Sequence, residues 1–249
     1  LMNAMRGWFV SGHDILLEYH VFNLTKDFNV WKMALYQDPY NACLSLTILP
    51  NYLYKLLHLH ELYVYKFFIH FLGALPVVLV YYLSKLYTKE NIAFLVGLLY
   101  ITFPTYMIDM AFLNRQGIAF IFFGLVVYNL LNTEYFTPRI RTMMLFVFGT
   151  GMVFSHYSTS YIAIPLLIGA YIINYMLRYV VFLDGPIWLL KITDRIKDKE
   201  IYKKPVLISL HFVVGMLIIM IFWSSVVTKT SRSLVQTIKQ IGTSLKDPF

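Results

Sequence analysis

Two carboxylates near the start of the sequence have a spacing that suits chemistry. Asp14 and Glu18 are four residues apart, so a helix through them would place both side chains on one face. Such a pair can supply a general base with a charged neighbour, or two oxygen ligands for a divalent cation. A structural role competes, because Ser11 and Asp14 match the capping-box pattern, in which Asp14 caps the helix that it begins. We take Asp14 and Glu18 as candidate catalytic residues, and whether a metal ion takes part is left open.

A second group of residues is suited to binding a substrate. Arg115 could hold a lipid phosphate, because a guanidinium presents two parallel donors to phosphate oxygens. The competing interpretation is an ion pair with Asp109, six residues earlier, or a side chain that extends to the lipid headgroups. His156 lies in a run of hydroxyl-bearing residues, where an ordinary polar turn is an equally good explanation. The candidate substrate-binding residues are His13, Asp109, Arg115, His156 and Tyr157.

The composition indicates an integral membrane protein. The 249-residue chain is 59% hydrophobic and only 14% charged, whereas soluble domains carry about 25% charged residues. A water-soluble fold of this length could not cover so much apolar surface. The net charge of +8 fits lysines and arginines that face anionic lipid, so nucleic acid is not expected as a partner. Cys43 is the only cysteine, which excludes an internal disulfide.

Six segments are apolar enough, and long enough or nearly so, to cross a bilayer, which takes about 20 residues. They cover residues 62–83, 92–108, 117–131, 140–154, 161–177 and 206–227. The predicted fold is therefore all-α, a polytopic transmembrane bundle with six helices over residues 61–228. Residues 1–10 are interpreted as the end of a truncated first transmembrane helix, and residues 229–249 as an outer segment that leads to a missing C-terminal part.

The distribution of lysine and arginine predicts the orientation. If the turn at residues 84–91 faces the cytoplasm, the inner segments hold eleven of these charges in 46 residues, and the outer segments hold eight in 86. The positive-inside rule favours this arrangement. Residues 11–60 then form an outer loop, in which residues 14–24 and 44–57 have the apolar spacing of juxtamembrane surface helices.

The candidate residues converge under this orientation. The loops that hold Asp14, Arg115 and His156 are far apart in the sequence, yet all three reach the outer side. Polar groups at membrane depth are costly and are usually kept for function or for mutual pairing. We therefore expect these three residues to line one cavity that opens outward.

Four sequence strings carry a resemblance to a known family. They are Ser11-Gly-His-Asp14 with Glu18-Tyr19, Tyr40-Asn-Ala-Cys-Leu-Ser-Leu-Thr-Ile-Leu-Pro50, Asn114-Arg-Gln-Gly-Ile-Ala119 and Ser155-His-Tyr-Ser-Thr-Ser-Tyr161. The order of an acidic first outer loop, surface helices and an arginine at the second outer turn resembles the GT-C superfamily of multispanning glycosyltransferases. That superfamily includes protein O-mannosyltransferases, aminoarabinose transferases and oligosaccharyltransferase catalytic subunits, and the strings look like a largely archaeal branch. The resemblance covers most of residues 11–180.

The resemblance implies an inverting transfer of a sugar from a polyprenyl-phosphate donor to a protein, lipid or glycan acceptor. It places the site outside a prokaryotic cell membrane, and it gives the role of base or metal ligand to Asp14, with Glu18 as a possible helper. The outer loop has no Asp-Asp, Asp-x-Asp or Asp-Glu doublet, which leaves a divalent cation open. The alternatives are a membrane transporter, for which inverted repeats would be expected, and a non-catalytic structural subunit of a membrane complex.

Overall fold

The computed structural model describes residues 7–12, 14–108, 110, 113–132, 136–182 and 208–231. Within these ranges the chain is helical between its turns and forms no strand. The elements are α1 (Asp14–Phe28), η1 (Met33–Leu35), α2 (Leu44–Leu57), α3 (Glu61–Tyr63), η2 (Val64–Phe68), α4 (Ile69–Leu72), α5 (Leu75–Lys85), α6 (Glu90–Thr102), α7 (Pro104–Met107), α8 (Asn114–Leu131), α9 (Pro138–Ser155), α10 (Tyr157–Phe182), α12 (Leu210–Ile221) and η5 (Phe222–Val227). The segments η2 and η5 are π-helical turns.

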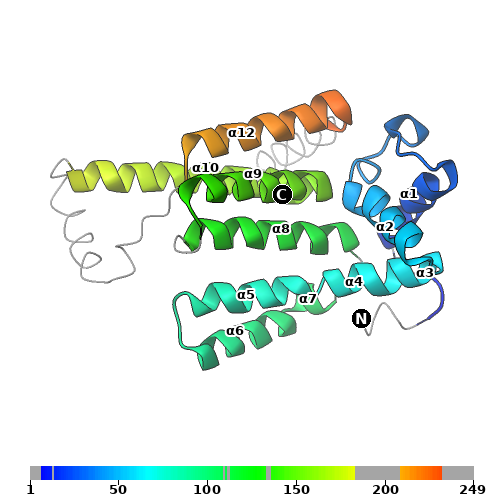
Figure 1. Ribbon diagram of the computed structural model, residues 1–249, viewed down its shortest axis with the longest axis horizontal. Helices are drawn as coiled ribbons and strands as arrows, with labels where there is room; N and C mark the ends of the chain where they lie inside the picture. The colour runs from blue at the N-terminus through cyan, green and yellow to red at the C-terminus, as the bar shows by residue number, and fades with distance from the viewer. Residues whose placement is uncertain are drawn as a thin grey trace, which may run out of the picture.

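The long helices lie side by side, and the first two helices cover one end of them. Figure 1 shows α5, α6, α8, α9, α10 and α12 running along the long axis of the molecule, with α1 and α2 gathered at the end where α8 begins. Helix α8 packs between α5 and α9, and α9 also packs against α12. The residues that α1 contributes are therefore held against the beginning of α8.

Among the described residues, four helical segments are long and apolar enough to cross a membrane, namely Glu61–Lys85 (α3 to α5), Asn114–Leu131, Tyr157–Met176 and Leu210–Val227. The sequence predicted six. The predicted segment 92–108 is interrupted at Phe103, because the residue before a proline is driven out of the helical region, and Phe103 precedes Pro104 with φ −63° and ψ 126°. Helix α9 has 18 residues but begins with Arg139 and Arg141, which lower its mean hydropathy.

The outer faces of these helices carry large apolar side chains. Leu99 on α6 is 71% exposed, Ile162 on α10 is 66% exposed, and Ile218 on α12 is 60% exposed. Soluble proteins rarely expose contiguous apolar surface on this scale. The exposed apolar faces and the four long helices together indicate a membrane protein.

The core between α8, α9, α10 and α12 depends on glycines at close approaches. A Cβ atom at Gly151 would lie 2.7 Å from the ring of Phe122, and one at Gly215 would lie 2.5 Å from the ring of Phe146. Apolar helices in lipid associate through such tight packing, because lipid tails provide no hydrophobic driving force between them. Small residues therefore set the spacing of α8, α9 and α12.

We expect Gly151→Ala to destabilise the fold, with Gly169→Ala as its matched control. The added methyl overpacks against Phe122, which typically costs about 1–3 kcal/mol. At Gly169 in α10 the same methyl meets nothing within 4 Å, so only the helix propensity changes, by about 1 kcal/mol in favour of Ala. Thermal unfolding in detergent should show a lower midpoint for Gly151→Ala alone, and equal midpoints would contradict the packing described here.

Residues 7–10 are not helical, so the interpretation of residues 1–10 as the end of a membrane helix does not hold for these four residues. The ammonium of Lys66 on η2 donates hydrogen bonds to the carbonyls of Gly7 and Phe9, so these groups are satisfied by a side chain rather than by helical amides. Residues 1–6 and 232–249, which include most of the predicted outer segment 229–249, lie outside the described residues.

The apolar face of α1 packs inward. Ile15 and Phe22 are buried against Tyr65 of η2, where the sequence predicted a face toward the membrane surface. Helix α2 buries polar side chains beside Leu46, and its Ser45 hydroxyl donates to the carbonyl of Ser155 at 2.9 Å. Its outward side is apolar, as Tyr52 at 63% exposure illustrates. Both helices are thereby fixed to the ends of the long helices.

Candidate active site at the end of the bundle

An ion pair joins α1 to the start of α8. A carboxylate oxygen of Asp14 lies 2.9 Å from Nη2 of Arg115. The guanidinium is almost enclosed, with the Arg115 side chain 6% exposed, whereas the Asp14 side chain is 40% exposed. The predicted alternative, an ion pair between Arg115 and Asp109, is not tested, because Asp109 lies outside the described residues.

Glu18 lies one turn behind Asp14 and is completely buried. Its Oε2 accepts a hydrogen bond from the backbone N–H of Asn114 at 3.0 Å and one from the hydroxyl of Tyr65 at 3.4 Å. Its Oε1 lies 3.4 Å from Nη1 of Arg115. Burial raises the pKa of Glu18 to about 8, while Arg115 and the Asn114 amide act in the opposite direction.

The carboxyl of Glu18 caps the N-terminus of α8. The first amides of a helix have no partner inside the helix, and the residue before Asn114, Leu113, has no side chain that could accept from them. Glu18 supplies that acceptor from another helix and fixes the place where α8 begins. Arg115, as the second residue of α8, is positioned by the same contact.

Tyr40 is a member of the site that the sequence did not identify. Its ring lies under the guanidinium, with 3.9 Å between the ring centroid and Cζ of Arg115, which is the geometry of a cation–π contact. The carboxylate of Asp38 accepts from the backbone N–H of Tyr40 at 2.9 Å and so shapes the turn that presents the ring. The turn residues alone do not indicate which cation the ring would meet, so no local signal could have found this contact.

His156 connects α9 to α10 and is buried beside the ion pair. Its Nδ1 lies 2.7 Å from the hydroxyl of Thr159. Burial and then the charge of Arg115 lower the pKa of His156 to about 3. The imidazole is therefore neutral near pH 7, and it offers one donor and one acceptor rather than a charge.

Asp14, Arg115 and His156 line one cavity of about 440 Å³ between α8 and α10. The cavity has two kinds of wall. Its polar end is formed by Asp14, Arg115, Gln116, His156, Ser158 and Thr159. Its apolar part is formed by Leu113, Phe120, Phe123, Ile162, Ala163 and Leu166. Ile162 and Leu166 are 66% and 60% exposed, so the apolar part opens through the side of the bundle.

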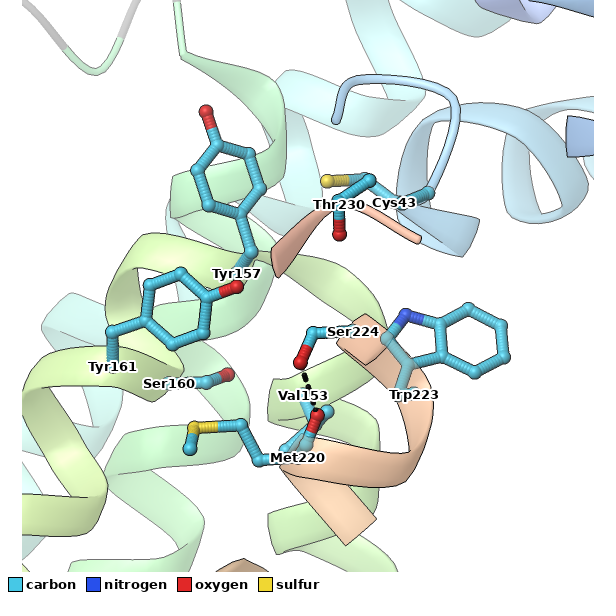
Figure 2. Close-up of a pocket in the computed structure, with 10 residues that line it drawn as sticks. Cys43, Val153, Tyr157, Ser160, Tyr161, Met220, Trp223, Ser224 and Thr230 are labelled. Atoms are coloured by element: carbon cyan, nitrogen blue, oxygen red, sulfur yellow. Dashed lines mark hydrogen bonds between the residues drawn. The ribbon is translucent and has the colours of Figure 1, made fainter. Parts of the chain in front are cut away.

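The other predicted site residues have different places. Glu18 does not line the cavity, and it contacts the site only through Arg115 and Asn114. Tyr157 lines a separate void of about 10 Å³ on the other side of α10, together with Cys43, Tyr161 and Ser224. Figure 2 shows Tyr157 and Tyr161 beside this void, across from η5. His13 lies outside the described residues, as Asp109 does.

A metal ion has no obvious set of ligands here. Among the described residues, no group of three or more His, Cys, Asp or Glu side chains could hold one. The two carboxyl groups of the site both face Arg115. The sequence-based expectation of a possible divalent cation therefore stays open.

Comparisons with known proteins identify no relative. No protein-family model, no curated protein and no solved structure matches this chain.

Proposed function

We propose that this chain is a membrane glycosyltransferase that moves a sugar from a polyprenyl-phosphate donor to a hydroxyl-bearing or amide-bearing acceptor. The observation that carries the proposal is the cavity with a charged end and an apolar flank. Asp14, Arg115 and His156 lie at one end, and exposed Ile162 and Leu166 form part of the open side. A ligand that fits both parts has a polar head and a hydrocarbon chain, and it can enter from the bilayer without leaving lipid.

Asp14 is the proposed base. Its carboxylate is the more exposed partner of the ion pair and it borders the cavity, so it can reach an acceptor proton. The acceptor oxygen or nitrogen attacks the anomeric carbon, the bond from that carbon to the phosphate oxygen breaks, and Asp14 takes the proton. Arg115 stabilises the negative charge that the departing phosphate keeps.

His156 and Thr159 are proposed to bind the sugar. A neutral imidazole and a hydroxyl can donate to and accept from sugar hydroxyls without a charge of their own. Glu18 and Tyr40 are positioning residues in this scheme, since both hold Arg115 and neither lines the cavity.

The proposal includes the membrane arrangement. The four candidate spans cross the bilayer, α6 and α9 are proposed to cross it as the shorter or less apolar return passes between them, the end with Asp14 faces outward, and the turn between α5 and α6 faces the cytoplasm. The basic residues at the opposite end support this, because Lys85, Lys89, Arg139 and Arg141 all lie there.

A pair of matched cysteine variants tests the orientation. In a Cys43→Ser background, Lys32→Cys and Lys89→Cys both replace an exposed lysine that precedes a helix. A thiol reagent that cannot cross membranes should label the first in intact cells, and it should label the second only after permeabilisation. Labelling of Lys89→Cys from outside would place the site on the cytoplasmic side.

A transfer assay tests the function itself. The protein is reconstituted in vesicles with a radiolabelled polyprenyl-phosphate sugar and a membrane extract that supplies acceptors. Label should pass to the acceptor fraction, and it should not do so with the Asp14→Asn variant. If label remains on the lipid but crosses the bilayer, the chain is a transporter. If it neither moves nor transfers, a structural subunit is the better description.

A further inference from the structure

The two partners of the ion pair are held very differently. Arg115 contacts the buried carboxyl of Glu18 and the ring of Tyr40, and only 6% of its side chain is exposed. Asp14 bonds to Arg115 at Nη2 alone, its other side-chain neighbour is the hydroxyl of Tyr40, and 40% of its side chain is exposed. The guanidinium is therefore fixed, and the carboxylate of Asp14 is the partner that can leave.

The contact with Asp14 occupies the position that a phosphate would need. Asp14 bonds to Nη2, whereas Glu18 faces Nη1. Both Asp14 and Arg115 line the cavity, and Glu18 does not. Nε and Nη1 of Arg115 are both buried, so an anionic group that enters the cavity would meet the guanidinium at Nη2, the nitrogen to which Asp14 is bound.

We propose that the ion pair of Asp14 and Arg115 is exchangeable, and that an anionic lipid phosphate replaces Asp14 on Arg115 when it binds. The proposal rests on the proposed function and concerns the regulation of that site. Phosphate takes over Nη2, Glu18 and Tyr40 keep the guanidinium in place, and the carboxylate of Asp14 is released into the cavity. The base is thus unmasked only when the donor is present, so an empty site does not activate water or an acceptor.

The two roles of Asp14 predict opposite effects in one variant. Asp14→Asn removes the anion that competes for Arg115, so the phosphate should bind more tightly. Because the ion pair is partly exposed, removing the competing carboxylate should raise the affinity for phosphate by roughly 3–10-fold. A residue that merely supported Arg115 would give the reverse, because its loss would leave the guanidinium less well oriented.

The experiment measures binding of undecaprenyl phosphate to the purified protein in nanodiscs of neutral lipid. Undecaprenol, which has the same chain without the phosphate, is the second probe. Asp27→Asn is the control variant, because it removes the same charge from the other end of α1. Asp14→Ser is a second variant that retains a capping side chain, in case Asp14→Asn does not fold.

The proposal predicts tighter binding of undecaprenyl phosphate to Asp14→Asn and Asp14→Ser, with no gain for undecaprenol and none for Asp27→Asn. Unchanged or weaker binding to the Asp14 variants, with transfer intact in the unmodified protein, overturns the exchange and leaves the proposed function standing. An equal gain for undecaprenol also overturns it, because charge would not be the cause. If no variant binds the phosphate, both the exchange and the proposed donor are wrong.

Discussion

Sugar transfer by Asp14→Asn should fall by about 10²–10⁴-fold, the usual loss when a general base is removed. Asparagine keeps the shape of the side chain and caps a helix as well as aspartate does, but it accepts no proton near pH 7. The contact between α1 and α8 loses the negative charge of Asp14, although Arg115 keeps Glu18 and Tyr40 as neighbours. The loss should therefore appear in kcat rather than in donor binding.

The measurement is the transfer rate as a function of donor concentration, with thermal stability recorded for each variant. Asp27→Asn on the same helix should transfer at the normal rate, because it lies away from the cavity. Arg115→Lys should differ from Asp14→Asn, since it retains the charge but loses the planar guanidinium that Glu18 and Tyr40 hold in place, so donor binding should weaken. A folded Asp14→Asn with normal turnover would reduce Asp14 to an ion-pair partner of Arg115.

Glu18→Ala should be the most destabilising substitution in the site. It removes the acceptor for two buried donors, the N–H of Asn114 and the hydroxyl of Tyr65. Each buried donor left without a partner costs about 1–3 kcal/mol, and the emptied volume adds to this. Chemical or thermal unfolding in detergent should therefore show a loss of several kcal/mol, on the order of the two costs combined.

Glu18→Gln is the matched control, and it also tests how Glu18 makes the stability of the protein depend on pH. Gln keeps a carbonyl oxygen at the same place, so much of the stability should return. Because burial raises the pKa of Glu18 to about 8, the folded protein keeps a proton that the unfolded chain releases above its ordinary value of 4.5. The stabilisation that Glu18 contributes is complete below pH 4.5 and is lost as the pH rises from there toward 8. Glu18→Gln should remove this part of the slope, and an unchanged slope would assign it to another group.

Local sequence was sufficient for the helices and for the kind of protein. Apolar runs predicted the positions of α5, α8, α9, α10 and α12, because the partition of side chains between water and lipid depends only on composition along the segment. The break at Phe103 was also present in the sequence, in Pro104, but the apolar residues on either side obscured it. The interpretation of residues 1–10 was wrong for residues 7–10, because the contacts with Lys66 are not local.

The site was only partly accessible from the sequence. Asp14, Arg115 and His156 were identified by residue type and by the predicted side of the membrane, and the structure places all three around one cavity. The same reasoning could not separate the exposed Asp14 from the buried Glu18, because both carboxylates lie on one face of α1 in any helical arrangement.

What the sequence by itself determined is an all-helical, apolar chain with a small number of polar residues near the helix ends. Only the tertiary structure decided which of them meet. Asp14 and Arg115 are 101 positions apart, and Glu18 reaches the amide of Asn114 across 96. Contacts at such separations depend on how α1 packs against α8, which is set by the combined shapes and close approaches of many side chains. That packing brings Asp14 to Arg115 and Glu18 to the amide of Asn114.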